Sequence, residues 1–555
     1  MQWLIAPGIT LFLILAYTLT KRYAAKRLRC YLDSLWGNER ALRHADDEQT
    51  DDIAQFDIAL RSHAPSLSET DSTTWNDLDM DLVFRTIDCS RSIVGSEVLY
   101  AMLHEQRRSQ EELDRIDQLS DAFLSQPGLR SEVQVHLSAI GYQAFHGASR
   151  FLFEAGYQYP RSRWLYYLSG ALPASLILAG FFYSPLFLIA ILIFFINIII
   201  YNVTKSKWEK ELIAIRHIGT VLRCAKKLSA LEWSALLLPE INEMKELSGQ
   251  LKAIRFWLPL FGMERMNNLD FITDYLKIAF MLDMVSLCGI IKGLNSHGEE
   301  VRRLYTLIGR IDACLSVAQL KIREKEWAKP VFHEKMQMEA QALRHPLLKS
   351  AVPNDCRWDG NMLISGANAS GKSTFIKAAA INMILSQSLG ICFARSMSMK
   401  RGTVMTSMAI RDSVTAGESY FITEIKSLRR IIETGRRGDM VWAFIDEILR
   451  GTNTVERIAA SASVLSAISG WGMLCMVATH DIELTEMLMD SYDNAHFTET
   501  VDESGVRFDY LIRQGPATSR NAIRLLDRMG FERTIVERAL RLSEKYEQSG
   551  VWSFS

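Results

Sequence analysis

The chain has 555 residues, more than one compact core normally holds, and this length favours about two to four domains. It carries 63 lysine and arginine against 64 aspartate and glutamate residues, so its net charge of −1 gives no overall positive field that would recruit nucleic acid, although a local basic surface is compatible with this balance. The 8 cysteines stand singly, without a C-x-x-C pair or a zinc-type histidine spacing, which indicates reduced thiols and excludes a disulfide framework or a classical zinc site.

Two stretches of the chain carry no charged residue, residues 1–20 and residues 164–203. A helix rises about 1.5 Å per residue, so the first stretch is long enough to cross the roughly 30 Å hydrocarbon layer once and the second twice. Tyr183-Ser184-Pro185 interrupts the second stretch with turn-forming residues, which predicts a hairpin of two antiparallel helices. The first stretch lacks the flanking residues of a signal peptide, and the second lacks the polar face of a buried soluble helix pair.

Basic residues flank these apolar stretches on the same side of the predicted membrane. They are Lys21, Arg22, Lys26, Arg27 and Arg29 after the first stretch, Arg161 and Arg163 before the second, and Lys205, Lys207 and Lys210 after it. Because lysine and arginine accumulate in cytoplasmic loops, the pattern predicts three passes through a cell membrane, an N-terminus outside, and most of the chain in the cytoplasm.

The residues between the apolar stretches have mostly helical patterns. Residues 28–60 are predicted to be helical, and residues 62–74 are rich in serine, threonine and acidic residues, which is typical of a linker. A folded unit is expected to begin near Trp75. From residue 79 to residue 104 the apolar positions have a helical period, and we expect a turn near Gly95.

The pattern of apolar residues changes after the second apolar stretch. Residues 205–327 are almost free of proline and have a helical period, which predicts several long helices. From residue 330 onward, short apolar runs such as 362–364, 441–445 and 473–478 alternate with helical segments. This alternation is typical of a doubly wound α/β sheet.

One segment of this C-terminal region matches the phosphate-binding loop G-x-x-x-x-G-K-[ST]. It runs from Gly366 through Gly371 and Lys372 to Ser373, directly after an apolar run and before helix-forming residues 374–385. In that context backbone N–H groups and the N-terminus of a helix converge on one anion site. The segment therefore predicts a nucleoside triphosphate site.

Two further strand ends complete this candidate site. The apolar run 441–445 ends in Asp446 and Glu447, and a later run ends before His480. We expect Ser373 and Asp446 to hold Mg²⁺, Lys372 to contact the β and γ phosphates, and Glu447 to orient and deprotonate the attacking water. His480 is expected to sense the γ-phosphate. Alone, each pattern is more often structural, but their order and spacing after the loop favour the functional interpretation.

Taken together, these motifs resemble those of the MutS family of DNA mismatch-repair ATPases. The similar segments are residues 366–374 to the family's G-P-N-M-G-G-K-S-T, residues 446–453 to D-E-x-x-R-G-T-[ST], residues 478–480 to A-T-H, residues 344–346 to R-H-P, residues 352–355 to V-P-N-D, and residues 417–424 to G-R-S-T-F-M-V-E. Residues 87–103 and 304–330 also resemble the family's helical core and lever.

The resemblance implies roles for residues that spacing alone does not single out. Asn368 and Thr374 would join the loop residues that bind ATP. Ser419 would reach the γ-phosphate held by a partner subunit, so that ATP would lie at a dimer interface. Residues 510–539 look like the family's short helical dimerisation tail, which implies a homodimer through the ATPase domain and this tail.

The chain also departs from the family's pattern. No room exists before Trp75 for the mismatch-reading and connector domains, and the F-x-E motif is missing from its expected N-terminal place. The predicted fold is α+α/β: a helical core and lever domain, interrupted by a transmembrane hairpin, followed by a P-loop (ABC-type) α/β ATPase domain. The predicted divisions are a transmembrane helix at 1–20, a helical segment and linker at 21–74, the first part of the core at 75–163, the transmembrane hairpin at 164–203, the second part of the core at 204–329, the ATPase domain at 330–510 and a C-terminal dimerisation tail at 511–555.

The sequence therefore predicts a membrane-tethered, dimeric ATPase that converts ATP and water to ADP and phosphate and moves helical arms. Its expected partners are the lipid bilayer and mismatched or branched DNA. Two alternatives remain open. An ABC-type transporter half would carry an L-S-G-G-Q segment where this chain has Gly417-Glu418-Ser419. A structural organiser at the membrane would keep the ATPase without a DNA role.

Overall fold

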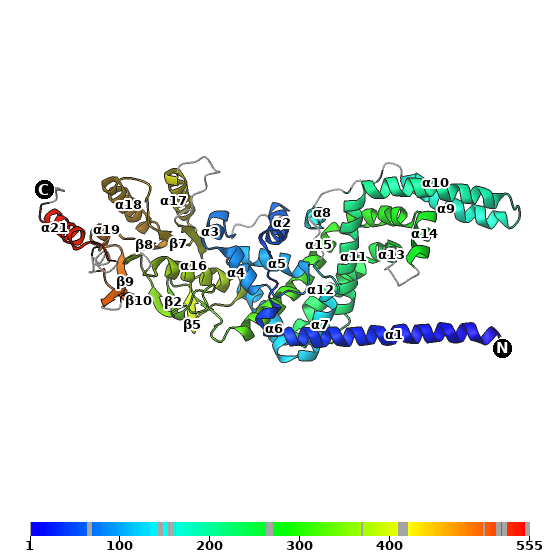
Figure 1. Cartoon of the computed structure of the whole chain (residues 1–555), viewed down its shortest axis with the longest axis horizontal. Helices are drawn as coiled ribbons and strands as arrows, with labels where there is room; N and C mark the ends of the chain where they lie inside the picture. Colours follow the sequence, from blue (N-terminus) through cyan, green and yellow to red (C-terminus); the bar gives the residue numbers. More distant parts are fainter. Residues whose placement is uncertain are drawn as a thin grey trace. The chain divides into compact units, whose positions relative to one another are not determined.

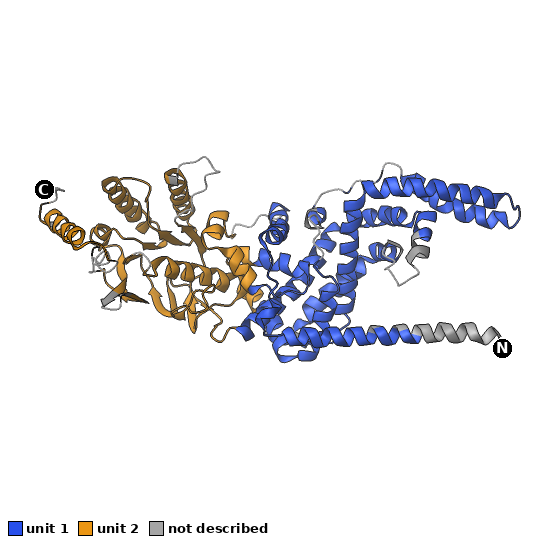
Figure 2. Ribbon diagram, in the orientation of Figure 1, with its two compact units in different colours: residues 1–66, 87–102, 115–323 blue, residues 67–86, 103–114, 324–555 orange. Residues whose placement is uncertain are grey.

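The structure is a computed structural model (Figure 1) that describes residues 2–63, 69–142, 148–153, 157, 160, 163–261, 270–367, 370–408, 420–502, 505–517, 523 and 530–549. The chain forms two compact units (Figure 2). Unit 1 comprises residues 1–66, 87–102 and 115–323, and unit 2 comprises residues 67–86, 103–114 and 324–555. The chain therefore passes between the units several times before it completes the second one.

Unit 1 is built from helices. They are α1 (Gln2–Leu35), η1 (Glu39–Ala41), α2 (Asp47–His63), α5 (Ile93–His104), α6 (Gln110–Ser125), α7 (Pro127–Ser138), α8 (Ala148–Phe153), α9 (Arg163–Gly180), α10 (Leu186–Lys207), α11 (Glu209–Leu228), η2 (Ala235–Leu237), α12 (Leu238–Gln250), α13 (Lys252–Phe261), α14 (Asp270–Ala279) and α15 (Leu282–Arg323), of which α5 and α6 end or begin in unit 2. Helix α15 is kinked at His297 and packs against α11, α12 and α13. Its apolar positions are buried over most of its length, as expected for the central helix of a bundle.

The N-terminal end of α5 packs closely against α15. Asp312 of α15 is fully buried and accepts hydrogen bonds from the backbone N–H groups of Arg91 and Ser92, both at 2.8 Å, and from the Ser92 hydroxyl at 2.6 Å. The predicted break near Gly95 lies instead at residues 88–92, and Gly95 is inside α5. A Cβ atom at Gly95 would lie 2.3 Å from Asp312 Oδ2, so this glycine serves close packing and not a turn.

Helices α9 and α10 form a hairpin and lie side by side (Figure 1). They are joined at residues 181–185, where Tyr183-Ser184-Pro185 was predicted to turn the chain. Among the described residues, α10 is the one helix long and apolar enough to cross a membrane. The first predicted pass falls in α1, where the side chains of residues 1–14 lie outside the described residues.

Two polar side chains of α10, those of Asn197 and Tyr201, face the neighbouring helices and not the exposed apolar surface. Asn197 Nδ2 donates to the carbonyl oxygens of Ser169 in α9 and Ala279 in α14, both at 2.9 Å. The Tyr201 hydroxyl donates to Asp283 Oδ2 at 2.6 Å. Both α10 side chains are buried, so these bonds fasten the hairpin to the rest of unit 1.

Unit 2 is a layered α/β structure with two sheets. Its strands are β1 (Val331–Phe332), β2 (Met338–Leu343), β3 (Asn354–Trp358), β4 (Met362–Ser365), β5 (Ser396–Met399), β6 (Thr403–Ser407), β7 (Val441–Asp446), β8 (Leu474–Ala478), β9 (Asp493–Asp502) and β10 (Gly505–Gln514), and its helices are α3 (Ser72–Asp77), α4 (Met80–Ile87), α16 (Lys372–Leu389), α17 (Tyr420–Arg436), α18 (Thr454–Ser469), α19 (Ile482–Met487) and α21 (Arg533–Ser549). The predicted strands at 362–364, 441–445 and 473–478 are confirmed.

The larger sheet has the order β10-β9-β4-β8-β7-β6 and is parallel from β9 to β6. Strands β4, β7 and β8 are almost fully buried, which fits their continuous apolar sequences. Because they are parallel neighbours, their carboxyl ends meet at one edge of the sheet. Ligands of open α/β sheets bind at this edge.

An N-terminal segment completes unit 2 beside β6. Helix α3 is capped by Asp71, whose side chain accepts from Thr74 N–H at 2.9 Å, so the predicted linker over residues 62–74 extends too far. Thr74 Oγ1 accepts from Thr406 N–H at 3.1 Å, and Asp77 accepts from the Thr406 hydroxyl at 2.6 Å. These contacts join α3 to strand β6.

Candidate functional site

The glycine-rich loop connects β4 to the N-terminus of α16. Gly366 and Gly371 have φ angles of 141° and 108°, a region that favours glycine. A Cβ atom at Gly366 would lie 2.7 Å from the carbonyl oxygen of Phe497, so the close approach of β9 also requires a glycine. The local sequence thus produces the predicted strand, tight loop and helix start, and the loop lies beside an exposed helix N-terminus.

Lys372 folds back over this loop. Its Nζ atom donates to the carbonyl oxygens of Gly366 at 2.6 Å and Ala367 at 2.9 Å. Burial lowers the pKa of Lys372, and the nearby carboxylates of Asp446 and Glu447 oppose that shift. The lysine is held at the loop with its charge close to two acidic groups.

The acidic pair lies at the end of the neighbouring strand β7. Asp446 accepts a hydrogen bond from the Ser373 side chain. Burial raises the pKa of Asp446, and this hydrogen bond lowers it by a smaller amount. Its Oδ1 atom is buried and has no hydrogen-bond partner among the described residues. A hydroxyl and a carboxylate with a spare oxygen are hard oxygen donors, so this pair fits Mg²⁺, which typically takes one or two protein ligands and completes its shell with phosphate and water.

Glu447 has a strained backbone and two polar neighbours. Its φ angle is 56°, which is unusual for a residue other than glycine, and its N–H group donates to the Ala478 carbonyl at 3.0 Å. Its carboxylate lies 2.8 Å from Arg450 Nη1 and 3.5 Å from His480 Nε2. The ends of β7 and β8 thus bring Glu447 and His480 together.

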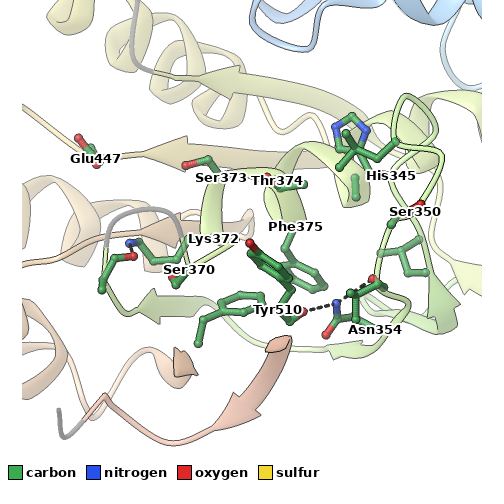
Figure 3. A pocket seen from close by; sticks show the side chains of 18 residues that line it. His345, Ser350, Asn354, Ser370, Lys372, Ser373, Thr374, Phe375, Glu447 and Tyr510 are labelled. Atoms are coloured by element: carbon green, nitrogen blue, oxygen red, sulfur yellow. Dashed lines mark hydrogen bonds between the residues drawn. The ribbon is translucent and has the colours of Figure 1, made fainter. Parts of the chain in front are cut away.

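A cavity of about 500 Å³ opens beside the loop (Figure 3). In the view, Ser370, Lys372 and Glu447 lie on one side, and His345 and Asn354 lie on the other. Burial lowers the pKa of His345 to about 4, so this imidazole is neutral at pH 7. The remaining lining residues are Leu343, Leu348, Ser350, Ala351, Val352, Ala367, Gly371, Ser373, Thr374, Phe375, Ala378, Phe497 and Tyr510.

The aromatic part of the lining was not predicted from the sequence. Phe497 lies on β9 and packs against Phe375 with ring centroids 5.9 Å apart. Tyr510 lies on β10, and its carbonyl accepts from Asn354 Nδ2 at 2.9 Å. No local motif marks these two aromatic residues, because only the pairing of β9 with β4 and β10 brings them to the loop.

Most of the predicted site residues therefore surround one edge of the larger sheet. The loop residues Gly366, Gly371, Lys372, Ser373 and Thr374 lie at the start of α16, and Asp446, Glu447 and His480 lie at the ends of β7 and β8. Asn368 and Ser419 lie outside the described residues. Within the ranges that the structure describes, no cluster of three or more histidine, cysteine or acidic residues forms a metal site.

This sheet, its glycine loop and its acidic strand end define an α/β domain in which a loop and a helix N-terminus lie at the carboxyl edge of parallel strands, an arrangement that suits an anionic ligand. Residues 362–547 match the family model described as MutS domain V. The chain is 25% identical over 253 residues to the DNA mismatch repair protein MutS of Thermus caldophilus, 27% identical over 269 residues to that of Aquifex pyrophilus, and 30% identical over 270 residues to that of Geobacillus thermodenitrificans.

These matches cover 45%, 46% and 45% of this chain and 30%, 31% and 29% of the respective relatives. These matches support a relationship of the chain to the MutS family, and the chain spans about a third of the length of the curated relatives that it matches.

Proposed function

We propose that the chain binds ATP and Mg²⁺ in the cavity beside the glycine loop and hydrolyses ATP to ADP and phosphate. The observation that carries this proposal is the convergence of Lys372, Ser373, Asp446 and Glu447 at the N-terminus of α16. Gly366, Asn368, Gly371 and Thr374 would complete the phosphate contacts. The cavity volume is within the range of about 300–1,000 Å³ that is typical of small-molecule sites.

The positions of the side chains favour distinct roles at the phosphate end. Lys372 would exchange its carbonyl partners for the β and γ phosphates, and Ser373 and Asp446 would hold the metal ion. When bound, Mg²⁺ would neutralise charge that develops on the phosphate oxygens. Glu447 would orient and deprotonate the attacking water, and His480, 3.5 Å from Glu447, would sense the γ-phosphate.

The rest of the cavity lining suits the nucleoside. His345 on the side opposite Lys372 is neutral at pH 7, and Phe497 and Tyr510 provide aromatic surface close to Gly371 of the loop. Neutral aromatic groups pack against a base without competing for its phosphates. The cavity thus has a polar, cationic end for phosphate and a neutral, aromatic side for the base.

A homodimer through the ATPase domain and C-terminal helix is part of this proposal. Ser419 would contact the γ-phosphate of the partner subunit, as the resemblance to the family implies. Helix α21 exposes Ile535, Leu540 and Tyr546, which supports a role in association. Sedimentation of the purified protein with and without ATP tests this, and a monomer under both conditions refutes it.

We also propose that the chain is anchored in a cell membrane by three passes, with unit 2 in the cytoplasm. Large apolar side chains are exposed along the α9–α10 hairpin, including Phe182, Leu188, Leu192 and Ile199, whereas Asn197 and Tyr201 are buried. This distribution is the one expected for helices that face lipid. Deletion of residues 164–203 should weaken retention in alkali-washed membranes, and unchanged retention with residues 1–20 also deleted would refute the anchor.

The output that we propose for the ATPase is binding of mismatched or branched DNA in a repair-related role. The support is similarity to proteins named for DNA mismatch repair, which also favours this role over a transporter half. Retention of duplex, branched and mismatched DNA by the solubilised protein, with and without ATP at stated salt concentrations, is the test. Equal absence of binding to all three DNA forms would leave the structural organiser as the better interpretation.

Phosphate release by the detergent-solubilised protein tests the ATPase itself. Glu447→Gln should bind ATP but release phosphate roughly 100- to 10,000-fold more slowly, because the general base is lost. Glu486→Gln is a matched control, since Glu486 lies on α19 outside the cavity lining. Wild-type turnover in Glu447→Gln would show that another residue activates the water.

A further inference from the structure

Glu424 is a buried acidic residue of α17 that the proposed catalytic steps do not use. Glu424 is only 8% exposed, and its Oε1 atom accepts a hydrogen bond from the backbone N–H of Arg450 at 3.1 Å. Burial raises the pKa of Glu424, and the backbone N–H groups of Arg450, Leu449 and Gly451 oppose the rise as hydrogen-bond donors. Glu424 is thus bonded to the backbone after β7 through the Arg450 amide, while its Oε2 atom is buried without a hydrogen-bond partner among the described residues.

The loop that supplies these amides has an unusual backbone. Glu447 and Leu449 have φ angles of 56° and 55°, which non-glycine residues adopt only when surrounding contacts hold them there. The backbone N–H of Arg450, which directly follows the second of these two residues, donates to Glu424. Glu424 therefore holds a turn that two left-handed residues shape.

Close packing between the loop and α17 gives independent evidence for the same contact. A Cβ atom at Gly451 would lie 3.0 Å from Phe421 Cβ and 3.3 Å from Phe421 Cα. Phe421 is on the first turn of α17, and Glu424 is one turn further along the helix. A side chain at position 451 would push the loop and α17 apart by a few tenths of an ångström.

We propose that Glu424 is a positioning residue that fixes Glu447 to helix α17, so that the orientation of the general base follows the position of that helix. The proposal rests on the ATPase function proposed above. Helix α17 begins at Tyr420, immediately after Ser419, the residue expected to contact the partner's γ-phosphate. The rise from Tyr420, which follows Ser419 in the sequence, to Glu424 is about 6 Å, so α17 would link the sequence neighbour of Ser419 to the loop of residues 447–451.

Substitution of Glu424 should separate nucleotide binding from turnover. In Glu424→Ala the affinity for a fluorescent ATP analogue should change by less than about twofold, because Glu424 does not line the cavity, while kcat should fall roughly 10- to 100-fold as Glu447 loses its position. Glu424→Gln keeps a hydrogen-bond acceptor for the Arg450 amide, so its kcat should lie between that of Glu424→Ala and that of the wild type. Glu433→Ala, on the same helix and paired with Arg429 at its surface, should behave as wild type.

A second measurement tests the contact without relying on activity. Amide hydrogen exchange of residues 447–453 in the nucleotide-free protein should become faster in Glu424→Ala and Gly451→Ala and remain unchanged in Glu433→Ala. If the wild-type protein hydrolyses no ATP, the proposed function fails, and exchange still decides whether Glu424 holds the loop. Unchanged exchange and unchanged kcat in Glu424→Ala would overturn the inference.

A double-mutant cycle tests the connection to the partner's site. If Glu424 transmits the position of α17, the losses of kcat in Ser419→Ala and Glu424→Ala should be non-additive. The kcat of the double variant should then lie within about twofold of the kcat of the slower single variant. Additive losses would show that the two residues act independently and would overturn the link to Ser419.

Discussion

Replacement of Lys372 by methionine is the most direct test of the nucleotide site. Methionine keeps much of the length of the side chain and its contact with the loop, but it removes the ammonium group. In the structure this group already donates to the carbonyl oxygens of Gly366 and Ala367, at 2.6 and 2.9 Å. ATP must replace these two bonds, so only the difference between phosphate and carbonyl contacts contributes to affinity.

The size of the effect follows from that difference. Two charge-assisted bonds to phosphate contribute about 3–6 kcal/mol, and the two bonds that are given up contribute about 1–3 kcal/mol once the carbonyls are hydrated. The midpoints of these two ranges differ by about 2.5 kcal/mol, so we expect a net loss of about 2–3 kcal/mol in Lys372→Met, which corresponds to binding weakened roughly 30- to 150-fold.

Titration with a fluorescent ATP analogue in the presence of Mg²⁺ measures this loss. Lys377→Met is a suitable control, because Lys377 lies one turn further along α16 and pairs with Asp79 at 2.8 Å outside the cavity lining. An affinity in Lys372→Met equal to that of the wild type would refute the assignment of the loop. A comparable loss in Lys377→Met would show that the effect is nonspecific.

Three further predictions address the metal ion, the core of unit 1 and the hairpin. Asp446→Asn should raise the Mg²⁺ concentration needed for half-maximal phosphate release by roughly 10-fold or more, and excess EDTA should abolish release by the wild type. Burial raises the pKa of Asp312 from 3.8 to about 7, so between these values the folded state binds a proton that the unfolded state releases, and stability rises as pH falls. The stability of the wild type relative to Asp312→Asn should therefore increase by about 1.4 kcal/mol per pH unit from pH 7 toward pH 4, measured by unfolding in detergent. Asn197→Leu should lower the stability by about 0.6–2 kcal/mol because it removes two interhelical hydrogen bonds.

Each of these three predictions has a contradicting result. An unchanged Mg²⁺ requirement in Asp446→Asn would show that the ion has other ligands. A constant stability difference across this pH range would mean that Asp312 does not change its protonation. Asn202→Leu controls for the hairpin, since Asn202 is exposed and donates only to Ile198 of its own helix, and equal losses in the two variants would contradict the role of Asn197.

The sequence determined the local parts of the molecule. The run at 362–364, the glycines at 366 and 371, and the helix that begins at Lys372 form where their sequence predicts, because strand, loop and helix start depend on neighbouring residues. The ends of β7 and β8 are likewise predictable, because a buried parallel strand is a continuous apolar run and its polar ending marks the carboxyl edge.

The tertiary structure decided which distant residues meet at this edge. Phe497 and Tyr510 reach the cavity through the pairing of β9 and β10, and Glu424 reaches the Arg450 amide because α17 packs beside the loop that follows β7. The tertiary structure also explains why Gly95 lies inside α5. Asp312, 217 residues later in the chain, packs so close to this position that no side chain fits there. Such contacts depend on the path of the backbone and on burial, which local propensity and residue spacing do not encode.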